Sequence, residues 1–234
     1  MMFQMVHPPE YRQSRSYFSY LYDIHLAFST HSLQDERLSD LIRSGYLFVL
    51  PQRDSFGRRV VFSRAASLDA SKFTAADVMR AHLLTFECLL FDEECQINGL
   101  TYIFDEQNTG WSHIAIWTPS EVTKAFTCSE KSIPIRHRQM NFIGLPWTMN
   151  LIFRFAKNLL STKLRKRLFT YSDFESTKDF IPSSILPSEY GGEGGSVDDM
   201  VEVWHKELEE RREKILALES FKSNSPNISA TKVG

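Results

Sequence analysis

Residues Pro146–Phe169 read PWTMNLIFRFAKNLLSTKLRKRLF, and this stretch decides the fold. At helical spacing, the apolar residues of its first half cover roughly 200° of the circumference. A helix with so wide an apolar surface must be buried on two sides or must line an apolar cavity. The residues that carry this surface are Met149, Leu151, Ile152, Phe153, Phe155, Ala156, Leu159 and Leu160.

The second half of the same stretch is basic. Ser161 is a favourable N-cap residue for a short helical turn. It is followed by four basic residues with no acidic residue among them, Lys163, Arg165, Lys166 and Arg167. The sequence therefore places an apolar wall beside a cationic cluster. This pairing suits a protein that holds an apolar molecule and meets an anionic surface.

The composition is that of a globular protein, with 42% hydrophobic and 24% charged residues in 234. The length allows one substantial α/β domain, or one domain with a helical appendage. A formal net charge of −2 gives no general attraction to nucleic acid, so we expect no nucleic-acid partner and a basic cluster that acts locally.

Three scattered cysteines, Cys88, Cys95 and Cys128, form no CxxC pair, which argues against a zinc site and a secreted disulfide framework. The first ten residues lack the features of a signal peptide. No apolar run is long enough to span a bilayer, because basic residues interrupt the most apolar one. We therefore expect a monomeric, cytoplasmic protein without a metal or cofactor.

Strands that alternate with helices predict an α/β fold with substantial parallel pairing. Helices are expected at 14–30, 38–44, 73–93 with Thr74 as the cap, 119–126, and 197 to about 219. Strands are expected at 46–50, 58–64, 96–105, 138–145 and 167–171, and the first two should be neighbours or a hairpin. The charged distal part of the last helix, 206–214, is expected to project into solvent.

No motif of a hydrolase, metalloprotease or nucleotide-binding protein occurs in the sequence. Ser112 and His113 are adjacent, and sequence neighbours seldom form a nucleophile–base pair. Asp105 and Glu106 follow a buried strand, where catalytic carboxylates occur, but a polar strand terminus or a helix cap is the favoured interpretation. An enzyme, such as an esterase, is therefore disfavoured.

Five blocks of the sequence carry a family resemblance when their order and spacing are taken together. They are DSFGRRVVFSR (54–64), QINGLTYIFDEQ (96–107), WTPSEVTK (117–124), IRHRQMNFIGLPWTMNLIFRFAKNLLSTKLRKRLF (135–169) and ILPSEYGG (185–192). The chain resembles the CRAL-TRIO lipid-binding family, above all its alpha-tocopherol transfer protein branch. The resemblance implies a CRAL-TRIO-type mixed, largely parallel sheet whose flanking helices enclose an apolar ligand cavity.

The resemblance also implies an intracellular protein that binds and transfers a tocopherol, a retinoid or a phospholipid. A mobile lid helix that opens at a membrane is expected at about Ser172–Pro182. There, Phe174 and Phe180 face the cavity, insert among lipids when the lid is open, or simply pack the lid down. The side chains predicted to wall the cavity are Ser112, Trp117, Phe142, Ile152, Phe153, Phe155, Phe174 and Phe180.

In the tocopherol-transfer branch, a basic turn before the lid binds phosphoinositide head groups. The matching turn here is STKLRKR, in which Lys163 and Arg165 are the closest positional equivalents and Lys166 and Arg167 are adjacent. The resemblance therefore implies transient, peripheral docking on phosphoinositide membranes. The alternative interpretation of this turn is a solvated charged face.

Family members usually carry a longer N-terminal helical domain, so residues 1–44 are interpreted as a residual N-terminal helical segment. Residues 45–206 form the expected lipid-binding domain, and 207–234 form a charged helix end and a disordered tail. We expect a shortened isoform or an incomplete gene model. The alternative function is an adaptor, built on a truncated domain, that transfers nothing.

Overall fold

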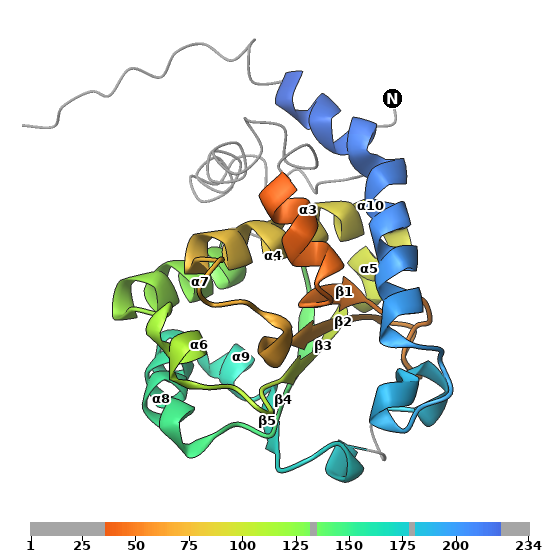
Figure 1. The fold of residues 1–234 in the computed structure, drawn as a ribbon. Helices are drawn as coiled ribbons and strands as arrows, with labels where there is room; N and C mark the ends of the chain where they lie inside the picture. Colours follow the sequence, from red (N-terminus) through yellow and green to blue (C-terminus); the bar gives the residue numbers. More distant parts are fainter. Residues whose placement is uncertain (1–35, 132–134, 178–180, 221–234) are drawn as a thin grey trace, which may run out of the picture.

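A computed structural model describes residues 36–131, 135–177 and 181–220 of the chain. At its centre is a five-stranded sheet in the order β1-β2-β3-β4-β5 (Figure 1). The strands are β1 (Leu47–Val49), β2 (Arg59–Arg64), β3 (Leu100–Asp105), β4 (His137–Ile143) and β5 (Leu168–Tyr171). β1 and β2 are antiparallel and the other neighbours are parallel, which confirms the predicted mixed, largely parallel sheet.

Helices surround this sheet, because parallel neighbours need crossover connections. The α-helices are α3 (Glu36–Arg43), α4 (Ala75–Leu90), α5 (Glu93–Asn98), α6 (Trp111–Ala115), α7 (Pro119–Lys131), α8 (Asn150–Leu159), α9 (Thr162–Arg165) and α10 (Val197–Ser220). Short 3₁₀ turns are η2 (Ala65–Ser67), η3 (Trp147–Met149), η4 (Glu175–Thr177), η5 (Ser183–Ile185) and η6 (Ser188–Tyr190). The helix predicted at 14–30 lies outside the described residues.

Thr74 begins α4, as its position in the sequence predicts. The Thr74 hydroxyl accepts a hydrogen bond from the Asp77 N–H at 3.3 Å, and the Asp77 carboxylate accepts one from the Thr74 N–H at 2.8 Å. This reciprocal arrangement is a capping box, which satisfies backbone donors that the first turn of a helix leaves open. Asp77 also forms an ion pair with Arg37 of α3 at 3.0 Å, so the cap joins two helices.

The strand predicted at 96–105 begins only at Leu100, because its first residues belong to helix α5. The Asp92 side chain caps α5 by accepting a hydrogen bond from the Cys95 N–H at 3.0 Å. Gly99 then reverses the chain with a φ of 85°, and a Cβ at this position would lie 2.3 Å from the Arg136 carbonyl oxygen. The apolar run therefore combines a helix end with a strand, separated by a residue that must be glycine.

Helix α10 packs against β1, α3 and α4. Figure 1 shows it along the β1 side of the molecule, where Trp204 is fully buried. Leu208 and Ile215 are also buried, so one face of the distal helix packs inward. The charged residues of the segment 206–214 largely meet solvent, with Lys206, Glu209, Glu210, Glu213 and Lys214 exposed. The helix is continuous across residue 206, where the sequence suggests that a domain ends.

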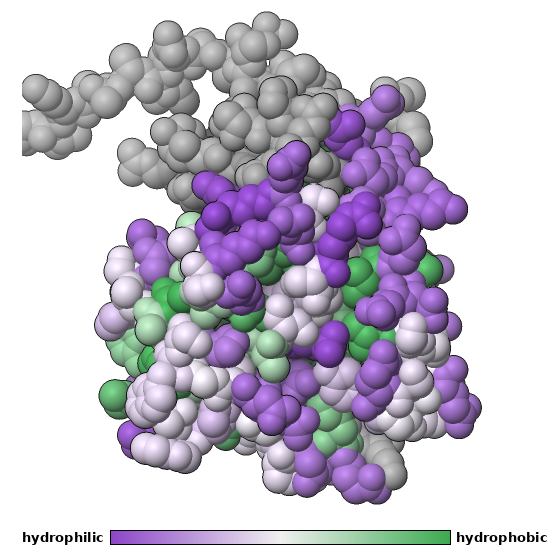
Figure 2. All heavy atoms as spheres, in the orientation of Figure 1, coloured by the Kyte–Doolittle hydropathy of each residue, from purple (hydrophilic) through white to green (hydrophobic). Residues whose placement is uncertain are grey.

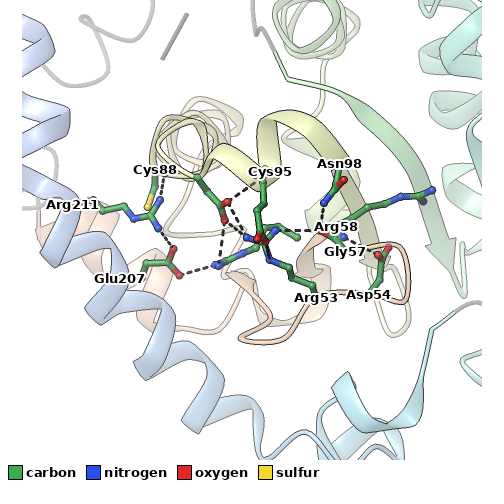
Figure 3. Close-up of polar contacts among 12 residues, drawn as sticks. Arg53, Asp54, Gly57, Arg58, Cys88, Cys95, Asn98, Glu207 and Arg211 are labelled. Atoms are coloured by element: carbon green, nitrogen blue, oxygen red, sulfur yellow. Dashed lines mark hydrogen bonds and ion pairs between the residues drawn. The ribbon is translucent and has the colours of Figure 1, made fainter. Parts of the chain in front are cut away.

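A cluster of polar side chains attaches α10 to the rest of the fold (Figure 3). Glu207 accepts a hydrogen bond from Arg59 of β2 at 2.6 Å and forms an ion pair with Arg211 at 2.9 Å. Arg211 donates in turn to the Cys88 carbonyl oxygen at 2.6 Å, near the end of α4. The Cys88 carbonyl oxygen also accepts a hydrogen bond from the Phe91 N–H at 3.3 Å, so Arg211 adds a second donor there. Together these contacts join α10 to both β2 and α4.

Replacing Glu207 with Gln should lower the free energy of unfolding by about 2 kcal/mol, because Arg59 and Arg211 would then face each other without their shared carboxylate. Urea denaturation followed by circular dichroism measures this change. Glu202→Gln on the same helix is the matched control, since its pair with Arg43 is at 3.8 Å and exposed. The control should lose less than about 0.5 kcal/mol, and equal losses in both variants would contradict a buried cluster.

Candidate functional site

A cavity of about 220 Å³ lies between one face of the sheet and helices α4, α6, α7 and α8. A single buried water needs only about 10–15 Å³, so this hollow is far larger than an ordinary packing defect. Its walls are mostly aromatic and aliphatic. The space between the sheet and α8 is therefore open rather than filled by side chains.

Strand β3 separates the hollow side of the sheet from a filled side, because successive side chains of a strand point to opposite faces. Tyr102 and Phe104 line the cavity, and Glu106 follows on the same face. Ile103 is fully buried on the other face. Asp105 also points away from the cavity, where its carboxylate accepts a hydrogen bond from the Tyr190 hydroxyl at 2.7 Å.

Stacked rings form the floor of the cavity. The rings of Phe104 and Phe142, on neighbouring strands, stack with their centroids 4.6 Å apart. Tyr102 stacks beside Phe104 at 5.8 Å, and Phe153 of α8 meets Phe142 edge-on at 5.0 Å. These contacts hold the rings against one another, which keeps the floor from closing into the empty space.

Helix α8 forms the wall opposite the sheet, and its existence confirms the helix predicted from apolar spacing. Ile152, Phe153 and Ala156 line the cavity, since they share one face of the helix. Leu151 and Phe155 lie on a neighbouring face and are 70% and 39% exposed. The predicted cavity position of Phe155 is therefore corrected, because the apolar surface of α8 is wider than the cavity.

Four of the predicted side chains line the cavity, namely Trp117, Phe142, Ile152 and Phe153. Ser112 does not, because it is exposed on α6 and its neighbour His113 faces the cavity instead. The sequence analysis missed the contribution of α4, which comes from Met79, His82 and Phe86. Their spacing of three and four residues marks one helix face, but sequence alone does not show which face meets a hollow.

Phe174 lies on the filled face of the sheet, not in the cavity. Its ring stacks parallel to Phe62 with centroids 6.0 Å apart and lies 4.4 Å from the ring of Tyr190. This position fits the alternative that Phe174 packs its own segment down. Phe180 lies outside the described residues. Within the described residues, α8 and not the segment 172–182 covers the cavity.

Two histidines in the cavity wall have hydrogen-bond partners at both ring nitrogens. His137 contacts the Ser129 carbonyl oxygen through Nε2 at 2.9 Å, so Nδ1 accepts a hydrogen bond from the Tyr102 hydroxyl at 2.6 Å. His113 accepts from the Gly110 N–H at 3.0 Å and contacts the carbonyl oxygen of Leu68 at 3.1 Å. These two side chains serve to position the wall.

Glu106 and His82 differ from these histidines, since the side chain of neither has a hydrogen-bond partner among the described residues. Burial, together with the nearby charge of Asp105, raises the pKa of the Glu106 carboxyl to about 7. Burial lowers the pKa of His82 to about 4, so this ring is neutral at neutral pH. The cavity therefore contains a carboxyl group close to half protonation and an uncharged imidazole, both open to a bound molecule.

The pKa of Glu106 predicts a pH-dependent stability. The folded protein holds this proton more tightly than the unfolded chain, so the contribution is complete below about pH 4.5 and is lost as the pH rises through about 7. Glu106→Gln cannot ionise, so between pH 5 and pH 8 it should gain about 2 kcal/mol in unfolding free energy relative to the native protein. Denaturant unfolding at both pH values measures this gain. Glu193→Gln, at an exposed position, is the control, and an equal gain there would contradict the prediction.

The predicted basic turn lies where the parallel strands begin. Lys163, Arg165 and Lys166 are exposed, and Arg167 is half-buried and donates a hydrogen bond to the His137 carbonyl oxygen. Leu168, the first residue of β5, pairs with Met140 of β4. The turn is therefore adjacent to the beginning of β4.

Arg136 and Arg138 extend this basic surface, and the sequence analysis missed them. Arg136 is exposed and donates to the Ile97 carbonyl oxygen at 3.1 Å, while Arg138 donates to that of Asn98 at 3.0 Å. In the described part of the chain, neither arginine forms an ion pair with a carboxylate. The available signal was their place at the start of a parallel strand beside the basic turn, since such strands begin at the same edge of a sheet.

An exposed apolar patch lies on α6, η3 and α8, outside the cavity wall. Its residues are Trp111, Trp147, Leu151 and Phe155, and the rings of Trp111 and Trp147 meet edge-on at 6.4 Å. Both tryptophans are more than half exposed, at 68% and 78%. Figure 2 shows apolar surface on the side of the molecule where α7 and α8 lie, whereas hydrophilic surface covers α10. Such a patch is typical of an interaction site.

The family model for the CRAL/TRIO domain matches residues 43–192. The chain belongs to this family. CRAL/TRIO is a family of lipid-binding and transfer proteins. The matched region contains the sheet and helices α4 to α9, which are the elements that enclose the cavity.

Clavesins are among the similar proteins of this family. Human (Homo sapiens) clavesin-2 is 30% identical over 187 residues, which cover 80% of this chain and 57% of the relative. Clavesin-1 of Xenopus laevis is 32% identical over 166 residues, which cover 70% of this chain and 50% of the relative. The chain thus spans about half the length of these relatives. The closer kinship to the tocopherol-transfer branch stays a prediction.

The crystal structure of Sfh5 has a similar fold, with a TM-score of 0.53 and 14% identity over 80% of this chain and 76% of that one. None of the helices in the described residues has the length and hydropathy that a membrane span requires. The same part of the chain contains no cluster of three or more side chains able to hold a metal ion.

Proposed function

We propose that this protein binds one small hydrophobic molecule in its cavity and transfers it at phosphoinositide-containing membranes. The mostly apolar cavity between the sheet and α8 is the observation that carries this proposal. A bound apolar molecule buries its own surface together with that of the cavity walls, and this burial contributes about 25 cal/mol per Å².

Helix α8 is the wall that we expect to move when the ligand enters or leaves. Ala156 is the buried residue of this helix, while Leu151, Phe155 and others on the helix remain partly exposed. The carboxylate of Glu130 in α7 holds the start of the next helix by accepting a hydrogen bond from the Ser161 N–H at 3.0 Å. A helix with so little buried surface can be displaced without unfolding the sheet.

The exposed apolar patch and the basic surface supply two different attractions to a membrane. Tryptophan rings are favourable at the level of the lipid head groups, and Trp111 and Trp147 belong to this patch. Each basic side chain near an anionic leaflet contributes on the order of 1 kcal/mol. If the membrane binds the form with α8 displaced more tightly than the closed form, docking favours ligand exchange.

Ala156→Phe should reduce the amount of lipid that copurifies with the protein, because the larger ring would occupy the cavity. The change should alter stability by less than about 1.5 kcal/mol, since the ring fills empty space. Lipid extraction and native mass spectrometry measure occupancy. Ala115→Phe adds the same ring at an exposed position of α6 and should bind as much lipid as the native protein. A native protein without lipid in every preparation would instead favour an adaptor.

Replacing Lys163, Arg165, Lys166 and Arg167 with Ala should weaken binding to phosphatidylinositol-bisphosphate vesicles by at least about tenfold. Vesicle co-sedimentation at fixed ionic strength measures this loss. The control removes four basic charges elsewhere, by replacing Arg43, Lys206, Arg212 and Lys214 on α3 and α10 with Ala. Equal losses in both variants would indicate general charge attraction, and unchanged sedimentation of the first variant would refute docking through this turn.

A further inference from the structure

Four polar side chains lie close together at one end of the cavity, and two of them, His82 and Glu106, have no side-chain hydrogen-bond partner among the described residues. Tyr46, Ser63, His82 and Glu106 all line it, and we call this group the polar end. Ser63 of β2 pairs with Phe104 of β3, two residues before Glu106. The Tyr46 hydroxyl lies next to that of Ser63 and within the electrostatic influence of Glu106. The rings of Tyr46 and His82 meet edge-on at 6.2 Å.

The side chains of His82 and Glu106 leave hydrogen-bonding capacity open toward the cavity. A buried polar group without a hydrogen bond costs about 1–3 kcal/mol, and most such groups in folded proteins are satisfied. His113 and His137, in the same cavity wall, follow this rule. Glu106 and His82 do not within the described residues, yet both face the hollow. A ligand with a polar group at this end would supply the partners.

The charges around the cavity restrict what that polar group can be. Its described lining contains two carboxyl groups, Glu106 and Glu130, and neither lysine nor arginine. The Asp105 carboxylate lies just behind Glu106, and Arg64 points to the filled face, where it donates to the Tyr190 hydroxyl at 3.1 Å. A carboxylate or phosphate placed at the polar end would therefore meet negative charge without a compensating cation.

We infer that this cavity selects lipids whose head group donates a hydrogen bond and carries no negative charge, namely an alcohol or an amine. Glu106 is the residue that accepts this hydrogen bond, and His82 offers a second neutral partner beside it. The apolar walls receive the chain of the lipid, and they discriminate by shape. The inference rests on the proposed function, since it identifies the chemical class that the proposed carrier would hold.

The test compares three ligands with the same 18-carbon chain, which are oleyl alcohol, oleylamine and oleic acid. The full-length protein is incubated at pH 7.4 with an equimolar mixture below the micellar range, separated by gel filtration, and extracted for quantification by mass spectrometry. We expect the alcohol or the amine to be retained about tenfold over the acid, and the alcohol-to-amine ratio distinguishes the two head groups. Preferential retention of the acid, or retention of none of the three, would overturn the inference.

Variants of Glu106 assign the selection to this residue. Glu106→Leu should remove the preference for alcohol and amine over acid, since it deletes the acceptor and its charge. Glu106→Gln keeps an acceptor oxygen, so it should retain the alcohol and lose the amine preferentially. Glu193→Gln, at an exposed position, should match the native protein. Unaltered selectivity in Glu106→Leu would refute the role of Glu106.

Two outcomes separate this inference from the proposed function. If the native protein retains no ligand here and copurifies with no lipid in any preparation, the carrier proposal itself fails. If it holds a copurified lipid with an acidic head group in a cavity that Ala156→Phe blocks, the carrier proposal stands and the inference about the head group fails.

Discussion

The alternation of side chains along β3 is the constraint on which the rest of the structure depends. One set, with Ile103 and Asp105, faces a densely packed layer, and the other, with Tyr102 and Phe104, faces a hollow. Because the strand is fixed between two parallel neighbours, neither set can rotate to the other face. The packed face therefore stabilises the fold, while the opposite face of the same sheet borders the space for a ligand.

The packed layer explains how the fold tolerates an empty interior. Phe62 stacks against Phe48 and Phe174 on this side, and Trp204 of α10 is fully buried there. On the hollow side, the rings of Phe104 and Phe142 stack against each other. This contact between neighbouring strands replaces part of the packing that a filled core would provide. The hollow therefore depends on neighbouring rings, while cohesion comes from the opposite layer.

Much of the fold can be predicted from the sequence because local signals agree with the tertiary structure. The cap at Thr74, the pairing of the first two strands and the apolar helix after Pro146 are all present. The prediction for 96–105 was wrong at its start, because an apolar run does not show that Asp92 begins a helix within it. For Phe155 and Phe174, the prediction required knowing which side of their segment faces the cavity, and periodicity alone does not give this.

Helix α4 is shared by two parts of the molecule. On one side the carbonyl oxygen of Cys88 accepts a hydrogen bond from Arg211, and on the other His82 and Phe86 form part of the cavity wall. The C-terminal helix α10 thus supports α4 on the side away from the cavity, although no residue of α10 lines the cavity. A chain that ended before Glu207 would lose this support, so ligand binding in the cavity depends on residues that do not line it.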